Sequence, residues 1–140
     1  WIRLRTDGKK TTLTIKKLES FEIDGTKELE IEVSDFEETN LVLNELGYTA
    51  HTYQENKRIR YMLNGVELDI DFWPYIPPYL EIEGKSEEAV KDMVKLLEVD
   101  ENKITSIDVQ GVFKTFYNID IADVPVVKFG EELDKKYYIN

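Results

Sequence analysis

The sequence predicts an α+β domain in which antiparallel strands predominate and about three helices punctuate them. Apolar and polar side chains alternate through much of residues 1–85, as expected for strands that bury one face. Other segments repeat apolar residues at helical spacing behind good capping residues. The length of 140 residues suits one domain, so we expect a single domain over residues 1–140.

Turn signals and prolines divide the alternating segments into strands. Asp7-Gly8, Asp24-Gly25 and Asn64-Gly65 are each typical of a tight turn, and the last predicts a hairpin. Prolines after Trp73 prevent the strands on either side of them from being one. The predicted strands are residues 2–5, 13–16, 28–33, 58–61, 66–71 and 79–84, with a short edge strand at 124–127.

Capping residues position the three helices. Ser34 and Glu37 have the spacing of a capping box, and Gly47 suits the end of that first helix. Ser86 caps the second helix, and the third is predicted to start near Ser106. The apolar stripes of the second and third helices are Val90, Met93, Val94 and Leu97, and Val109, Val112, Phe113 and Phe116.

Composition excludes several classes of function. A formal net charge of −11 makes the chain unsuited to an anionic nucleic-acid backbone or membrane surface. No apolar run approaches the roughly 20 residues of a spanning helix. The absence of cysteine excludes disulfides, thiolate zinc sites and cysteine nucleophiles. We therefore expect a cytoplasmic protein that binds neither nucleic acid nor a membrane.

The strands carry charges that are segregated by sign from one strand to the next. A solvated face of a half-buried sheet is the simpler interpretation, although such faces tend to mix signs within a strand. The basic pairs are Arg3 with Arg5 and Arg58 with Arg60, and the acidic sets are Glu28, Glu30 and Glu32, Asp69 and Asp71, and Glu81 and Glu83.

A barrel with a charged interior is the alternative interpretation. The sheet would close on itself and turn its apolar faces outward against the helices. Each desolvated ion would cost several kcal/mol unless it were neutralised. Divalent cations on the paired carboxylates and a polyanion on the arginine pairs would neutralise both signs of charge.

Six segments in order carry a family resemblance: WIRLR at 1–5, LTIK at 13–16, ELEIE at 28–32, KRIRY at 57–61, LDIDFWP at 68–74 and LEIEG at 80–84. Together they resemble the CYTH family, also called triphosphate tunnel metalloenzymes. That family includes class IV adenylyl cyclases, thiamine triphosphatases and inorganic triphosphatases. The resemblance covers about residues 1–120 and implies an eight-stranded antiparallel tunnel that binds a triphosphate lengthwise.

The resemblance also implies roles for the charged residues. Phosphate oxygens would be bound by Arg3, Arg5, Lys16, Arg58 and Arg60, with Lys57 as an alternative inward residue on its strand. A metal cofactor, Mg²⁺ or Mn²⁺, would be held by Glu30, Glu32, Asp71, Glu81 and Glu83. Glu28 shares the face of Glu30 and Glu32, so the register of that strand could differ by two residues.

One family motif is absent from the sequence. The family's first strand carries Glu-x-Glu-x-Lys, which supplies metal ligands and a catalytic lysine, whereas this sequence begins where the second strand would begin. We therefore expect a CYTH-like domain that lacks its first strand, either because the native protein carries that strand upstream of this sequence or because the protein has lost it, and no catalytic residue is assigned. Without that strand, weak or no catalysis is expected.

The expected function is metal-dependent hydrolysis of a triphosphate, either inorganic tripolyphosphate or an organic triphosphate. One alternative is a class IV-type adenylyl cyclase that forms cyclic AMP from ATP. Another is a noncatalytic domain that binds polyphosphate or a nucleotide. The expected partner is a small-molecule triphosphate, and the chain is expected to be a monomer or a homodimer.

Overall fold

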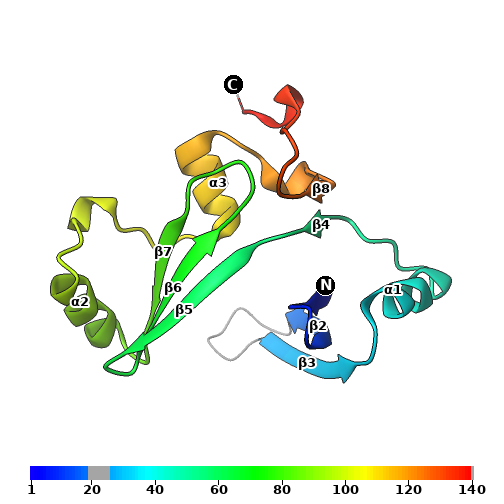
Figure 1. Cartoon of the computed structure of the whole chain (residues 1–140), viewed down its shortest axis with the longest axis horizontal. Coiled ribbons are helices and arrows are strands. Elements are labelled where there is room, and N and C mark those ends of the chain that lie inside the picture. The colour runs from blue at the N-terminus through cyan, green and yellow to red at the C-terminus, as the bar shows by residue number, and fades with distance from the viewer. Residues whose placement is uncertain (19–25, 140) are drawn as a thin grey trace. The chain divides into compact units, whose positions relative to one another are not determined.

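A computed structural model describes residues 1–18 and 26–139 (Figure 1). It divides into two compact units, Trp1–Ala50 and His51–Asn140. The described residues hold three α-helices and mainly antiparallel sheets, which confirms the α+β class. Within these residues no helix has the length and apolar character needed to cross a bilayer. The turn predicted at Asp24-Gly25 lies outside the described residues.

The first unit contains an antiparallel sheet in the order β1-β2-β3. Its strands are β1 (Ile2–Thr6), β2 (Thr11–Leu18) and β3 (Thr26–Val33). The predicted turn after β1 is confirmed, because Asp7 Oδ1 accepts hydrogen bonds from the backbone N–H groups of Lys9 at 2.8 Å and Lys10 at 2.7 Å. Gly8 supplies the positive φ of 83° that the turn requires.

Helix α1 (Phe36–Glu45) begins one residue later than the sequence predicted. Its N-cap is Asp35, whose Oδ1 accepts from the Glu38 backbone N–H at 2.8 Å, so the assignment of the cap to Ser34 is wrong. Asp35 has the same three-residue spacing to a glutamate that Ser34 has, and a carboxylate also interacts favourably with the helix dipole. Gly47, at φ 88°, ends the helix as predicted.

The second unit contains the predicted hairpin and a third strand beside it. Strands β5 (Lys57–Leu63), β6 (Val66–Phe72) and β7 (Tyr79–Glu83) form an antiparallel sheet with β6 in the centre. Asn64 and Gly65 join β5 to β6 with φ of 52° and 77°, the paired positive values of a tight hairpin turn.

A short parallel pair completes the strands of the second unit. It consists of β4 (Tyr53–Gln54) and β8 (Val126–Val127), so the edge strand predicted at 124–127 is present but shorter. In the parts of the chain that the structure describes, the strands form three separate sheets, and none of these closes into a barrel. The same unit holds the 3₁₀-helices η1 (Glu101–Lys103), η2 (Ile121–Asp123) and η3 (Lys135–Tyr137).

Helix α2 (Glu87–Leu96) packs against β6 and β7 (Figure 1). Ser86 is its N-cap, as predicted, and accepts from the Ala89 backbone N–H at 3.2 Å. Met93 of the helix forms a buried cluster with Val66 and Leu68 of the central strand. The helix therefore covers the apolar face of this sheet and leaves the charged face on the other side.

Helix α3 (Val109–Tyr117) is capped by Asp108, two residues after Ser106, and Asp108 Oδ1 accepts from the Gly111 backbone N–H at 2.8 Å. A carboxyl group three residues before a backbone N–H that has no partner within the helix again provides the cap. Phe113 is fully buried within the larger core cluster and meets Trp73 edge-on with ring centroids 6.1 Å apart.

The substitution Phe113→Ala should lower the free energy of unfolding by about 3–5 kcal/mol, because it leaves a cavity in the core. Phe116 lies on the same helix but is 57% exposed. Phe116→Ala is therefore the matched control, with an expected change below about 1 kcal/mol. Urea denaturation of both variants measures the difference, and equal losses would contradict the assignment of the core.

Candidate functional site

The strand register places oppositely charged side chains opposite one another on the β5–β7 sheet. Arg58 is paired with Asp71 across β5 and β6, and Arg60 is paired with Asp69. The third strand continues the same face with Glu81 opposite Asp69. We call this surface, with Glu67, Tyr79 and Glu83, the charged face of β5–β7.

Arg58 is the most heavily paired side chain on this face. Its Nε and Nη2 donate to Oδ1 and Oδ2 of Asp71, both at 2.6 Å, in a bidentate pair. Nη2 also donates to Glu81 Oε2 at 2.7 Å. Nη1 forms an ion pair with Asp69 Oδ2 at 2.7 Å. All three guanidinium nitrogens are therefore engaged by carboxylates.

Arg60 makes a second bidentate pair. Its Nε and Nη2 donate to Oδ1 and Oδ2 of Asp69 at 2.9 and 2.8 Å. Nη2 also forms an ion pair with Glu67 Oε1 at 2.7 Å. Asp69 Oδ2 is thus shared between Arg58 and Arg60, and this carboxylate joins the two arginines into one network.

The two aspartates are buried in the central strand, with exposed fractions of 2% for Asp69 and 1% for Asp71. The hydrogen bond from Arg60 holds the pKa of Asp69 below its usual range. The same pairing raises the pKa of Arg60, and the hydrogen bond to Asp71 raises the pKa of Arg58. Both arginines therefore stay charged at any pH at which the protein is folded.

On β7, burial raises the pKa of two ionisable side chains, Tyr79 and Glu81. Loss of hydration raises the pKa of Glu81, although the neighbouring charge of Arg58 opposes this shift. Burial, followed by the negative charge of Asp71, raises the pKa of Tyr79 to about 12. Tyr79 is therefore a neutral hydroxyl beside the network at physiological pH.

The first unit has a charged face of its own, whose contacts are looser. Arg3, Thr14 and Glu30 are aligned across β1, β2 and β3. Thr14 Oγ1 donates to Glu30 Oε2 at 2.7 Å, and Glu28 forms long ion pairs of 3.9 Å with Arg3 and 3.8 Å with Lys16. Exposed pairs of this length contribute little to stability.

The same register places the remaining residues predicted for this unit on that face. Arg5 is aligned with Thr12 and Glu32, and Glu32 pairs with Lys10 at 3.2 Å. The guanidinium carbon of Arg3 lies 5.3 Å from the Trp1 ring centre, and Lys16 Nζ lies 5.8 Å from the same ring system. Each unit therefore brings its own predicted residues to one face of one sheet.

Lys57 belongs to the other face of β5, because it alternates with Arg58. Its Nζ lies 4.7 Å from the centre of the Phe129 ring, a cation–π contact within the second unit. The structure therefore favours Arg58 and Arg60 over Lys57 as the charged-face residues of this strand.

The carboxylates of β7 have donor chemistry that suits a hard cation. In the described ranges no group of three or more acidic or histidine side chains lies close enough to form a metal site. Mg²⁺, however, commonly takes one or two protein carboxylates and completes its shell with water and substrate phosphates. Glu81 and Glu83 fit that requirement, and Asp71, whose oxygens each accept one hydrogen bond from Arg58, keeps further lone pairs for a cation.

Two members of the network were missed as site residues by the sequence reasoning. Asp69 bridges both arginines and Glu67 pairs with Arg60, yet only Asp71 was assigned from that strand. The available signal was the alternation of Glu67, Asp69 and Asp71, which puts all three acids on one face.

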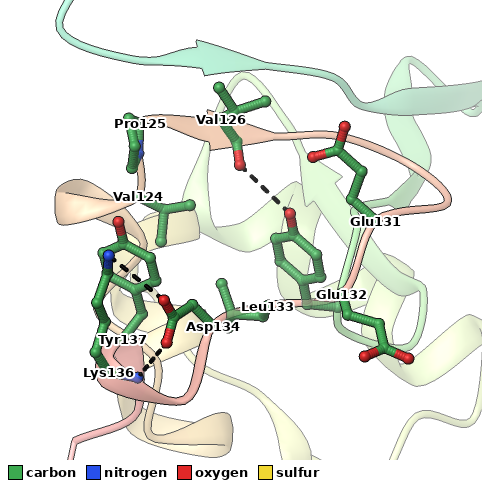
Figure 2. A pocket seen from close by; sticks show the side chains of 10 residues that line it. Val124, Pro125, Val126, Glu131, Glu132, Leu133, Asp134, Lys136 and Tyr137 are labelled. Carbon is green, nitrogen blue, oxygen red and sulfur yellow. Dashed lines mark hydrogen bonds and ion pairs between the residues drawn. The ribbon is translucent and has the colours of Figure 1, made fainter.

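A hollow of about 190 Å³ lies elsewhere in the second unit, between residues 124–126 and 131–137 (Figure 2). Tyr75 also lines it, and its hydroxyl donates to the Val126 carbonyl at 3.4 Å. None of the predicted site residues lines this hollow, so it is separate from the charged face.

Comparison with known proteins identifies the family. The sequence profile of the CYTH domain matches residues 1–112. The chain belongs to the CYTH domain family. This family includes triphosphatases and adenylyl cyclases, and the match runs through both charged faces described above.

Two solved structures resemble this CYTH protein. A conserved hypothetical protein from Pyrococcus furiosus is 28% identical, with a TM-score of 0.59 over 77% of this chain and 71% of the other. The PH1012 protein from Pyrococcus horikoshii is 22% identical, with a TM-score of 0.57 over 74% of this chain and 68% of the other, and shows similarity of fold. No curated protein matches the chain significantly.

Asp69→Asn should lower the free energy of unfolding at pH 7 by about 3 kcal/mol, since it breaks a buried charge pair. Because the folded-state pKa of Asp69 is lowered, its contribution is complete above its unfolded pKa of about 3.9. That contribution is lost as the pH falls through the folded value. The difference between wild type and variant should therefore be constant from pH 7 to 5 and shrink below about pH 4.

Urea denaturation over this pH range measures the effect. Asp92→Asn is the control, because Asp92 is exposed on α2 and its ion pair with Lys95 is long, at 3.9 Å. It should change stability by less than about 0.5 kcal/mol at any pH. A wild-type advantage over Asp69→Asn that persists undiminished to pH 3 would contradict the stated role of this carboxylate.

Proposed function

We propose that this CYTH protein hydrolyses a triphosphate, inorganic tripolyphosphate or an organic triphosphate, in a metal-dependent reaction. The observation that carries the proposal is the charged face of β5–β7, where guanidinium groups are fixed by buried carboxylates beside the exposed acid Glu83. Arginine forks match phosphate oxygens, and carboxylates match divalent cations. Membership of a family that includes triphosphatases supports the same conclusion.

The proposal includes a closed barrel with the charged faces inside. The barrel is supported by the strand register, which places charged and apolar residues on opposite faces of the sheet in each unit taken by itself. In the second unit α2 covers the apolar face, as such a barrel requires of its outer surface. A barrel of this kind would present the basic residues to one bound triphosphate.

The basic side chains would act by binding and orienting the substrate. Phosphoryl transfer needs positioning and charge stabilisation more than covalent chemistry. Guanidinium groups that are already fixed need little reorganisation when the phosphate charge shifts during the reaction. The proposed phosphate-binding set is Arg3, Arg5, Lys16, Arg58 and Arg60.

Carboxylates would hold the metal ion. Glu81 and Glu83 are the proposed ligands in the second unit, and Glu30 and Glu32 are those in the first. Bound Mg²⁺ or Mn²⁺ supplies neutralisation of phosphate charge and an acidified water. Asp71 completes the proposed set, with each of its oxygens also accepting a hydrogen bond from Arg58.

Noncatalytic binding of a triphosphate is a second candidate. It is favoured because Glu81 already pairs with Arg58. Among the described residues, Glu83 is then the acid of β7 that makes no hydrogen bond or ion pair. A binder of this kind would depend on the arginines and not on a metal. Metal dependence of phosphate release therefore separates the two candidates.

The primary test is release of phosphate from tripolyphosphate, ATP and thiamine triphosphate with Mg²⁺ or Mn²⁺ and with EDTA. A triphosphatase should release phosphate with the metal and lose this activity in EDTA. Cyclic AMP and pyrophosphate from ATP would instead indicate a cyclase. Binding without turnover in either buffer, both by this chain and by a version extended upstream to carry the family's first strand, would identify the noncatalytic domain.

Glu83→Gln should lower metal-dependent phosphate release at least about 10-fold, because it removes one carboxylate ligand without changing side-chain size. Glu88→Gln is the control, since Glu88 is an exposed residue in the first turn of α2. Its activity should stay within about twofold of wild type. Unchanged activity of Glu83→Gln at limiting metal concentration would argue against this ligand.

A further inference from the structure

Arg58 and Arg60 alternate on one strand, but their guanidinium groups are not equivalent. Arg58 has every nitrogen engaged: Nε and Nη2 by Asp71, Nη2 also by Glu81, and Nη1 by Asp69. A phosphate could be bound in bidentate fashion by this group only after carboxylates had been displaced from it. Three of these four contacts are made to side chains that are at most 3% exposed.

Arg60 retains donors that the network does not use. Its contacts to Asp69 and Glu67 involve Nε and Nη2. Within residues 1–18 and 26–139, Nη1 of Arg60 donates no hydrogen bond, and the contacts to its paired carboxylates are made by Nε and Nη2. The Arg60 side chain is also 51% exposed, compared with 36% for Arg58. Its unused N–H groups can therefore meet a ligand without breaking a buried pair.

Asp69 fixes the orientation of the Arg60 guanidinium group and of its unused N–H groups. Its two oxygens hold Nε and Nη2 of Arg60, so the guanidinium plane is set and Nη1 is the remaining corner. Its Oδ2 is held in turn by Arg58 Nη1 at 2.7 Å. Arg58 thus acts on Arg60 through a shared and buried carboxylate.

We propose that Arg60 is the residue of this strand that donates to the substrate phosphate, and that Arg58 and Asp69 are positioning residues that orient it. This inference rests on the proposed function, because it assigns roles within the same triphosphate site. It divides a pair that the sequence presents as two equal phosphate ligands into one ligand and one support.

Charge-conserving substitutions test this division. Arg60→Lys and Arg58→Lys each keep one positive charge but lose the planar fork, so they form a matched pair. Tripolyphosphate binding to the full chain is measured by calorimetry in EDTA and in Mg²⁺, together with the urea midpoint of each variant.

Arg60→Lys should weaken tripolyphosphate binding about 10-fold and change the urea midpoint little. Arg58→Lys should lower the urea midpoint clearly, while binding to the folded protein changes less than about threefold. If Arg58→Lys weakens binding as much as Arg60→Lys, or if Arg60→Lys leaves binding unchanged, the division is wrong. Should Arg58→Lys not fold, unchanged binding by Arg60→Lys would still overturn the division.

Asp69→Asn provides a readout that a purely structural residue would not affect. It should weaken tripolyphosphate binding alone but cause no further loss when combined with Arg60→Lys, because it acts through that side chain. Additive losses in the double variant would overturn the positioning role. Failure of the wild type to bind tripolyphosphate in either buffer would overturn the proposed function as well, which distinguishes the two failures.

Discussion

Two buried carboxylates on the central strand hold the charged face of β5–β7 together. Asp69 and Asp71 lie almost fully out of water, and an ionised carboxylate at such a position is stable only when paired. Arg58 and Arg60 satisfy that requirement with bidentate contacts of 2.6–2.9 Å. The arginines are in turn fixed on strand β5, which is otherwise exposed along its length. The rigidity of the two guanidinium groups therefore originates in the neighbouring strand and not in their own.

Strict alternation explains how one short strand serves both the core and the charged face. Val66 and Leu68 of β6 pack with Met93 of α2, while Asp69 and Asp71 point to the other side of the same strand. A shift of one residue in register would bring aspartates under the helix and apolar residues among the arginines. Both faces therefore specify the same register. The tight turn between β5 and β6 also fixes this register.

Features that depend on local sequence could be predicted, whereas features that depend on distant pairing could not. Alternation predicted the strands and the hairpin, and the Ser86 cap was recognised from its position ahead of an apolar stripe. The cap at Asp35 was misassigned by one residue because two overlapping capping patterns compete there. The parallel β4–β8 pair joins segments about 70 residues apart and is too short to show any periodicity. The pairing of Asp69 with Arg60 follows from the predicted turn, but the additional contact of Asp69 with Arg58 depends on side-chain geometry, which the sequence does not contain.

The balance of charge on this face also bears on how an acidic chain can bind an anion. Five acids surround two arginines, so the face as a whole is negative even though each aspartate is paired: Glu67, Asp69, Asp71, Glu81 and Glu83 against Arg58 and Arg60. A triphosphate that approached it alone would meet repulsion from the acids as well as attraction from the free edge of Arg60. Cations that accompany the substrate would remove that repulsion without disturbing the buried pairs. Metal dependence of a triphosphate site on this face would thus follow from its electrostatics, before any contribution of the cation to the chemical step.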